Sequence, residues 1–292
     1  MHLLKVRSKV ELTTIVSMPV TSELRQTACT AFNSSDIELK MAKASVLIAC
    51  AAINNIAKIQ RKDAQNQPGL PAKPELLEPL NVDKRSPFTP AGHAALIHAI
   101  CHIEFNAVNL ALDAIWRFDG MPDQYYKDWA QVAKEEAYHF TLLQSHLKTI
   151  AYNDARGYEY GDFPAHTGLW TMCEKTKDDI VARMALVPRT LEARGLDATP
   201  LIQAKLRKVK TPYADDAIAI LDIILRDEIG HVAIGNHWYR WLCQRDGLDP
   251  LDHYVTLHNR HAAPKLRAPF NTEARLKAGF TPQEIAFLSA IA

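Results

Sequence analysis

The chain has 292 residues, of which 48% are hydrophobic and 23% charged, so it can bury a full core and disorder is excluded as the default state. Lysine and arginine total 34 against 33 acidic residues, and this net charge of +1 excludes a global field that would select nucleic acid or an anionic membrane. Five widely spaced cysteines without a C-x-x-C pair indicate reduced thiols in a cytoplasmic compartment.

The first ninety residues predict a helix followed by a proline-rich connector. We expect no secretory signal, because the stretch from residue 10 to 20 is interrupted by Glu11. The longest apolar run, Ala44 to Ile53, is about ten residues, whereas a membrane span needs roughly 20, so no membrane partner is expected. Asp36 is a good N-cap for a helix that should reach about Asp63. The prolines between residues 65 and 90 then predict an extended strap.

Two long helices are expected next. The first begins with Thr89 as its cap and Pro90 in its first turn, and it should run to Phe118 before Asp119 and Gly120 stop it. The second should extend from near Pro122 to about Asn153. A loop rich in glycine and tyrosine follows over residues 156–166.

Two further long helices complete the set. The third is predicted from Thr167 to Arg194, with a kink at Pro188 and Gly195 as its stop. A short helical piece over residues 201–209 should precede the fourth, which runs from about Thr211 to Asp246. No convincing alternating segment is present, so the sequence predicts an all-α fold. We expect three parts: residues 1–90 as N-terminal helix and strap, 91–247 as a four-helix bundle, and 248–292 as short C-terminal helices on the bundle.

A repeated pattern on these helices indicates metal chemistry. Glu136 and His139 form a Glu-x-x-His pair on the second helix, and Glu228 and His231 form another on the fourth. Three-residue spacing points both members of a pair to one helix face. Single candidate glutamates, Glu104 and Glu192, lie on the first and third helices. The order matches the ligand set of ferritin-like di-iron and di-manganese carboxylate proteins.

The surroundings of these glutamates predict that they are buried. Apolar residues flank Glu104, Glu136 and Glu228 at helical spacing on the same helix face. A buried, unpaired carboxylate costs several kcal/mol, so each needs a cation, a hydrogen bond or a proton. Arg183 or Arg189 could supply that cation instead of a metal, and Glu174 is the alternative to Glu192 as the fourth carboxylate.

An additional acid precedes the first residue of each pair. Second-shell carboxylates commonly accept the free N–H of a ligating histidine. We assign that role to Asp227, whereas Glu135 is open between the same role and a solvated side chain.

Four stretches carry a resemblance to a known family. They are residues 71–118, which contain His102-Ile103-Glu104 and Leu112-Asp113; residues 135–140; residues 184–197; and residues 226–232. Together they resemble an uncharacterised ferritin-like di-iron carboxylate family, domain of unknown function 455, over roughly residues 35–270. The resemblance implies a ferritin-like bundle and carries the metal-ligand roles to Glu104, Glu136, His139, Glu192, Glu228 and His231. By ligand pattern alone, the chain is also distantly similar to the bacterial tRNA hydroxylase acting on methylthio-isopentenyl-adenosine.

Three functions compete on these observations. The leading hypothesis is an oxidoreductase in which two metal ions, iron or else manganese or a mixed pair, activate O2 or peroxide for oxidation of a small-molecule substrate. The alternatives are a ferroxidase or iron-handling protein and a metal-free helical scaffold. The sequence names no substrate, and a homodimer is compatible with it. Two basic clusters, over residues 205–210 and 260–277, leave tRNA as a second candidate partner.

Overall fold

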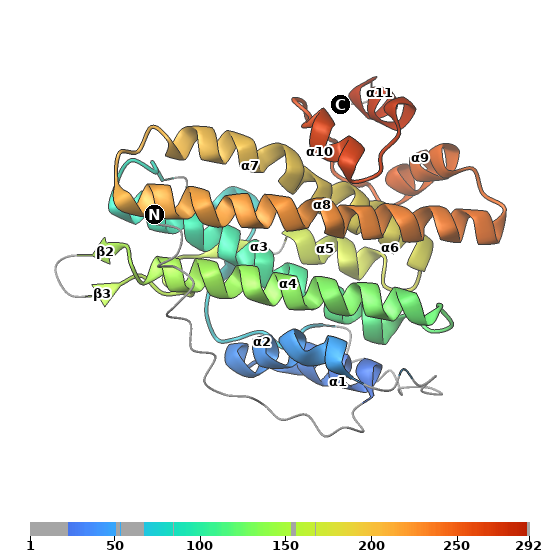
Figure 1. The fold of residues 1–292 in the computed structure, drawn as a ribbon, viewed down its shortest axis with the longest axis horizontal. Coiled ribbons are helices and arrows are strands. Elements are labelled where there is room, and N and C mark those ends of the chain that lie inside the picture. Colours follow the sequence, from blue (N-terminus) through green and yellow to red (C-terminus); the bar gives the residue numbers. More distant parts are fainter. Residues whose placement is uncertain are drawn as a thin grey trace.

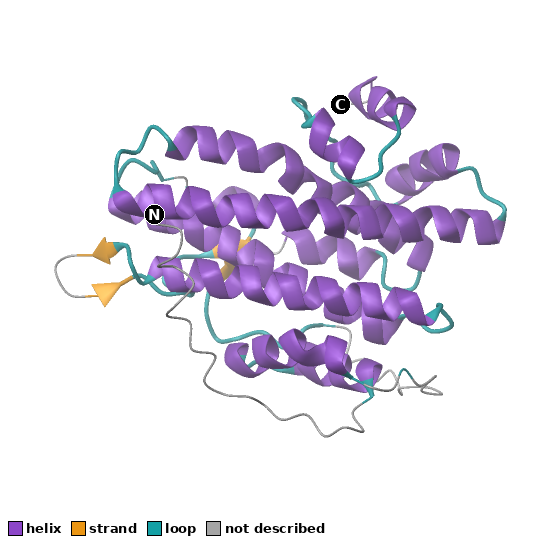
Figure 2. Cartoon of the chain, in the orientation of Figure 1, coloured by secondary structure: helices purple, strands orange, loops and turns teal. Residues whose placement is uncertain are grey.

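The computed structural model describes residues 23–50, 53, 67–83, 85–152, 156–166 and 168–290. Over these residues the protein is mostly helical, which confirms the all-α prediction at that level (Figures 1 and 2). The described strands are two residues long each. Parallel β1 (Leu76–Leu77) and β4 (Ala165–His166) tie the connector to the loop before α5, and antiparallel β2 (Ala151–Tyr152) and β3 (Arg156–Gly157) form a small hairpin.

Three long helices begin close to the residues that the sequence predicts, because the residues that start a helix lie next to it in the sequence. Helix α3 (Pro90–Arg117) begins after Thr89, whose side chain accepts the Gly92 N–H at 3.1 Å. Helix α8 (Pro212–Asp246) ends at Gly247, whose φ of 68° is the left-handed conformation that glycine adopts easily. Helix α4 (Asp123–Leu147) ends earlier than the predicted Asn153, because the chain turns after Leu147 into β2.

The prediction of one continuous third helix was wrong. The chain instead forms α5 (Gly168–Lys175), α6 (Ile180–Leu186), a π-helical turn η5 (Val187–Glu192) and α7 (Ala193–Leu206). Asp179 caps α6 and separates it from α5. Pro188 falls in the π-turn and Gly195 lies inside α7, so the piece predicted over residues 201–209 is mostly the end of that helix.

The long helices pack around one interior. Helix α4 contacts both α3 and α8, and α8 in turn contacts α6, η5 and α7 (Figure 1). Helix α3 has the length and apolar composition of a membrane span, with a mean hydropathy of 1.4 in its most apolar window. However, 78% of that window is buried within the molecule, as in the core helix of a globular bundle.

Two short N-terminal helices cover α3 and α4. Helix α1 (Leu24–Asn33) was not predicted, and α2 (Ile37–Val46) is followed by a single 3-10 turn, η2 (Leu47–Ala49). The helix predicted to reach Asp63 therefore stops early, because Cys50 is extended with ψ at 124°. The remainder of that prediction, residues 51, 52 and 54–66, lies outside the described residues.

The connector and the C-terminal segment consist of short elements. Apart from β1 and the 3-10 turn η4 (Pro79–Asn81), the described residues between 67 and 89 are irregular. Helices α9 (Pro250–Arg260), α10 (Thr272–Lys277) and α11 (Pro282–Ala290) lie on the side of α8 opposite to α1 and α2 (Figure 1). The domain limits at residues 90 and 247 remain a prediction.

Candidate metal centre

Acidic and imidazole side chains from three helices converge in the interior. Glu104 of α3, Glu136 and His139 of α4 and Glu228 of α8 are all buried, and each offers a ligand atom within 4.8 Å of the others. His231 of α8 joins them, because its Nδ1 lies 2.8 Å from Glu136 Oε1 and 3.6 Å from Glu228 Oε1. Five of the six predicted ligands are therefore in one cluster.

Glu136 occupies the middle of this cluster. One of its oxygens, Oε1, faces His231, and the other, Oε2, lies 3.5 Å from His139 Nδ1. His139 Nδ1 is also 3.3 Å from Glu104 Oε2. Because each oxygen of Glu136 meets a different histidine, this carboxylate is placed to serve two neighbouring positions at once.

Glu192, the sixth predicted ligand, lies at the edge of the cluster. It is the last residue of the π-turn η5 and is 8% exposed. Burial raises the pKa of its carboxyl well above the ordinary value, and repulsion from Glu228 and Glu136 raises it further. Glu192 is therefore close enough to sense the charges of the other glutamates, although it is outside the group of four that lies within 4.8 Å.

Many buried polar atoms of the cluster form no well-aligned hydrogen bond among the described residues, although Nδ1 of each histidine lies 2.8–3.6 Å from carboxylate oxygens. They are Glu104 Oε2, both carboxylate oxygens of Glu136 and of Glu192, His139 Nδ1 and His231 Nδ1. Buried polar atoms are normally paired, and leaving one unpaired costs about 1–3 kcal/mol or more. The cluster could hold a metal ion, since a cation would satisfy these atoms together.

The outward nitrogen of each histidine meets an acid from the opposite helix. His139 Nε2 of α4 lies 3.1 Å from Asp227 Oδ2 of α8, and His231 Nε2 of α8 lies 2.8 Å from Glu135 Oε2 of α4. Asp227 thus has the partner that the sequence suggested, and Glu135 has one as well. The arrangement leaves Nδ1 of both histidines turned toward the glutamates.

Two further residues fix these outer acids and were missed in the sequence. The side chain of Gln131, one turn before Glu135, donates to Glu135 Oε1 at 2.6 Å. Arg226, next to Asp227, donates to Asp227 Oδ1 at 2.8 Å. Spacing along a helix could have suggested Gln131, because residues four apart share a face.

The electrostatics of the metal-free cluster follow from burial and mutual charge. Burial and repulsion among the carboxylates raise the pKa values of Glu104 and Glu228. Burial acts in the same direction on Glu136, but the two histidines outweigh it and lower its pKa. For the histidines, burial is outweighed by the surrounding carboxylates, which raise the pKa of both His139 and His231 well above the ordinary value.

The alternative pairings considered from the sequence are occupied elsewhere. The guanidinium of Arg183 pairs with Asp113, and that of Arg189 pairs with Glu284 at 2.7 Å. Glu174, the reserve carboxylate, is half-buried on α5 and pairs with Lys177 at 3.1 Å. Arg275, counted in the second basic cluster, is buried and paired with Asp197.

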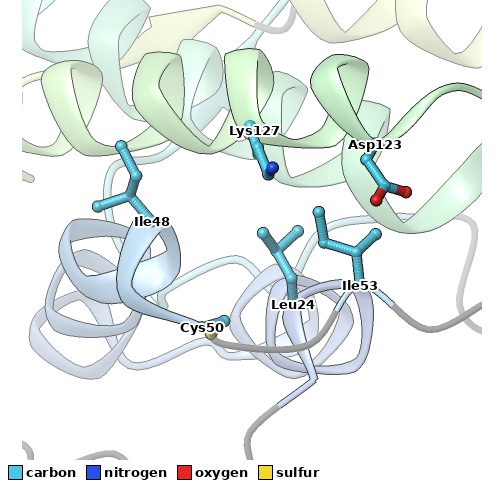
Figure 3. Close-up of a pocket in the computed structure, with 6 residues that line it drawn as sticks. All are labelled: Leu24, Ile48, Cys50, Ile53, Asp123 and Lys127. Atoms are coloured by element: carbon cyan, nitrogen blue, oxygen red, sulfur yellow. The ribbon is translucent and has the colours of Figure 1, made fainter.

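Two cavities lie away from the cluster. One, of about 280 Å³, separates the N-terminal helices from α4 and is lined by Leu24, Ile48, Cys50, Ile53, Asp123 and Lys127 (Figure 3). The other, of about 380 Å³, lies between α8 and the turn after α10 and includes Asn236, Arg240 and Gly279. Neither is lined by a predicted metal ligand.

The fold and the cluster together define a helical protein with a buried glutamate–histidine site that could hold a metal ion. Residues 33–286 match the family described as "Protein of unknown function (DUF455)", and the chain belongs to this family. A curated protein of Haemophilus influenzae, described as "Uncharacterized protein", is 51% identical over 227 residues, covering 75% of this chain and 76% of the relative. No solved structure matches the chain.

Proposed function

We propose that the protein is a ferritin-like four-helix bundle that binds two metal ions and acts as an oxygen-activating oxidoreductase on a small-molecule substrate. Iron is the proposed metal, with manganese or a mixed manganese–iron pair as the alternative. The observation that carries the proposal is the convergence of buried carboxylate and imidazole atoms around one interior point, most of them without a well-aligned hydrogen bond among the described residues. The four bundle elements would be α3, α4, the α6–η5–α7 segment and α8.

The donor set fits two divalent cations better than one. When ionised, the carboxylates of Glu104, Glu136, Glu192 and Glu228 carry a charge that two divalent ions balance. Oxygen and imidazole donors suit iron and manganese, and the described cluster offers no cysteine thiolate that would favour zinc or copper(I). Glu136 would help to hold the metal ions, since its two oxygens face different histidines.

When bound, the metal pair would supply the electrons and the open coordination positions for oxygen activation. The chain would supply orientation: Asp227 and Glu135 accept the Nε2–H groups of the two histidines, so both rings present Nδ1 to the metals. The protein interior around the cluster would keep bulk water out, because the flanking residues Ile97, Cys101 and Phe140 are buried.

The parts outside the bundle support an oxidoreductase over an iron-storage subunit. The N-terminal helices and the C-terminal helices cover opposite sides of the bundle (Figure 1), where a storage shell would need faces free for assembly. A cytoplasmic location, a homodimer and a tRNA substrate remain predictions from the sequence.

Metal analysis is the first test. Protein purified from cells grown with iron and manganese should contain about two metal ions per chain, and Glu136→Gln should lose most of both, because it removes the central charged carboxylate. Glu174→Gln is the matched control, since this glutamate lies on α5 outside the cluster, and it should keep the wild-type content. Fewer than about one ion per chain in the wild type would support the metal-free scaffold instead.

Reaction of the ferrous protein with O2 tests the chemistry. We expect O2 consumption with a transient change in optical absorption, and loss of both in Glu136→Gln. Gel filtration separates the main alternative, because a 12-mer or 24-mer shell with sustained iron uptake would instead indicate a ferroxidase.

A further inference from the structure

The π-turn that carries Glu192 is held from behind by the C-terminal segment. Arg189, three residues before Glu192, is 3% exposed, and its guanidinium is paired with the C-terminal helix α11. Its Nη2 donates to Glu284 Oε1 of α11 at 2.7 Å, and its Nη1 donates to the side-chain oxygen of Asn236 on α8. Its guanidinium also lies 4.8–5.6 Å from the ring centres of Tyr239, Tyr254 and Phe280.

Glu284 is itself fixed by three sources of hydrogen bonds. Besides Arg189, its carboxylate accepts from Arg240 of α8 at 2.7 Å and from the backbone N–H of Thr281 at 2.7 Å. It is 4% exposed, and these donors hold its pKa below the ordinary value although burial acts in the opposite direction. At neutral pH Glu284 is therefore an ionised, immobile partner for Arg189.

The π-turn also rests directly on α8. A Cβ added to Gly235 would lie 2.5 Å from Pro188 Cβ, so the backbone of α8 comes close to the turn at this glycine. The next residue, Asn236, accepts a hydrogen bond from Arg189 through its side-chain oxygen. Its side-chain nitrogen donates to Ala278 O at 2.8 Å. The π-turn therefore packs on one side against α8, at residues one helical turn after His231. On the other side it contacts the C-terminal segment that contains Glu284.

We propose that Arg189 and Glu284 are positioning residues that set the π-turn, and through it the placement of Glu192 toward the metal cluster. π-helical turns are rare, do not keep the hydrogen-bond register of an α-helix, and are often found at functional sites. The C-terminal segment, which makes no direct contribution to the predicted ligand set, would then be required for the full site. This inference rests on the proposed function for its metal readout.

Hydrogen exchange of the metal-free protein tests the inference without any metal. Glu284→Gln should speed exchange of the backbone amides of residues 187–193 by about tenfold, because it leaves Arg189 buried without a carboxylate. The matched control is Asp119→Asn, which removes the carboxylate that pairs with another buried arginine, Arg25, near the N-terminal helices. It should leave exchange in the π-turn unchanged. Equal acceleration in both variants, or none in Glu284→Gln, would refute the positioning role.

Metal titration provides the second readout. In Glu284→Gln the weaker of the two ferrous ions should bind about fivefold to tenfold more weakly, and adding Glu284→Gln to a Glu192→Gln background should weaken it no further, because both changes act through one group. Additive weakening would overturn the proposal. If Glu284→Gln does not fold, Glu284→Asp, which keeps the charge, should show the same effects at smaller size. A wild type that binds no metal would end the proposed function, whereas the exchange comparison would still decide the positioning role.

Discussion

At the scale of single residues, each histidine of the cluster is shared between two helices. His139 turns Nδ1 toward Glu104 and Glu136 and gives Nε2 to Asp227 on α8. For Asp227, burial is outweighed by the hydrogen bonds from His139 and Arg226, which lower its pKa to about 2. Asp227 is therefore a charged acceptor at neutral pH that holds Nε2 of His139, and it would keep the proton on this nitrogen if Nδ1 bound a metal ion.

Replacing Asp227 should weaken the site without unfolding the protein. In Asp227→Asn the acceptor loses its charge, so His139 is a less basic and less oriented ligand, and metal affinity should fall by about 10- to 100-fold. Asp222→Asn, on the same helix but bonded to Gln203, should leave affinity unchanged. Competition with a coloured chelator measures both. Equal affinities in the two variants would show that Asp227 has no role in orienting His139.

The members of the cluster could be predicted from the sequence, whereas their pairings could not. Glu-x-x-His is a local signal, because three-residue spacing on a helix fixes which side chains share a face. The hydrogen bond between Glu135 of α4 and His231 of α8 depends on how the two helices are aligned, and no local sequence pattern predicts that alignment. For the same reason Arg189 was considered only as a possible partner of a site glutamate, although it pairs with Glu284.

At the scale of elements, the π-turn is where local signals failed. The caps of α3 and α8 lie beside those helices in sequence, so their starts were predicted correctly. Glycine often ends a helix, yet Gly195 lies inside α7, which continues to Leu206. Pro188 suggested a kink, whereas the chain forms a π-turn that packs closely against Gly235 of another helix.

Two glycine-to-alanine changes should have opposite effects on stability. Gly235→Ala places a methyl group against the ring of Pro188, and overpacking of this kind costs about 1–3 kcal/mol of the free energy of unfolding. Gly195→Ala meets nothing within 4 Å, so it should stabilise the protein by about 0.5–1 kcal/mol through helix propensity. Urea denaturation of the metal-free variants measures both. A neutral Gly235→Ala would mean that α8 and the π-turn are not in close contact.

At the scale of the whole molecule, several histidines outside the glutamate–histidine cluster are buried as neutral groups. His93 lies at the start of α3 with its ring 5.9 Å from that of His146, near the end of α4. His98, farther along α3, accepts the Gly161 N–H from the loop before α5 at 2.9 Å. Burial lowers the pKa of each of the three to about 4 from 6.5, and the neighbouring histidine adds to this effect for His93 and His98.

These histidines should make the metal-free protein unstable in mild acid. Between pH 6.5 and about 4 the unfolded chain binds protons at His93, His98 and His146 that the folded chain does not, so stability falls as the pH is lowered through this window, by up to about 1.4 kcal/mol per pH unit for each group. His93→Leu removes one of the three, and because neither ring nitrogen of His93 has a hydrogen-bond partner among the described residues, it strands no other group. Urea denaturation at several pH values should show a shallower decline in this variant, whereas His237→Leu, at an exposed position, should keep the wild-type slope. Parallel declines in wild type and His93→Leu would mean that His93 is protonated in the folded protein and that its burial is incomplete.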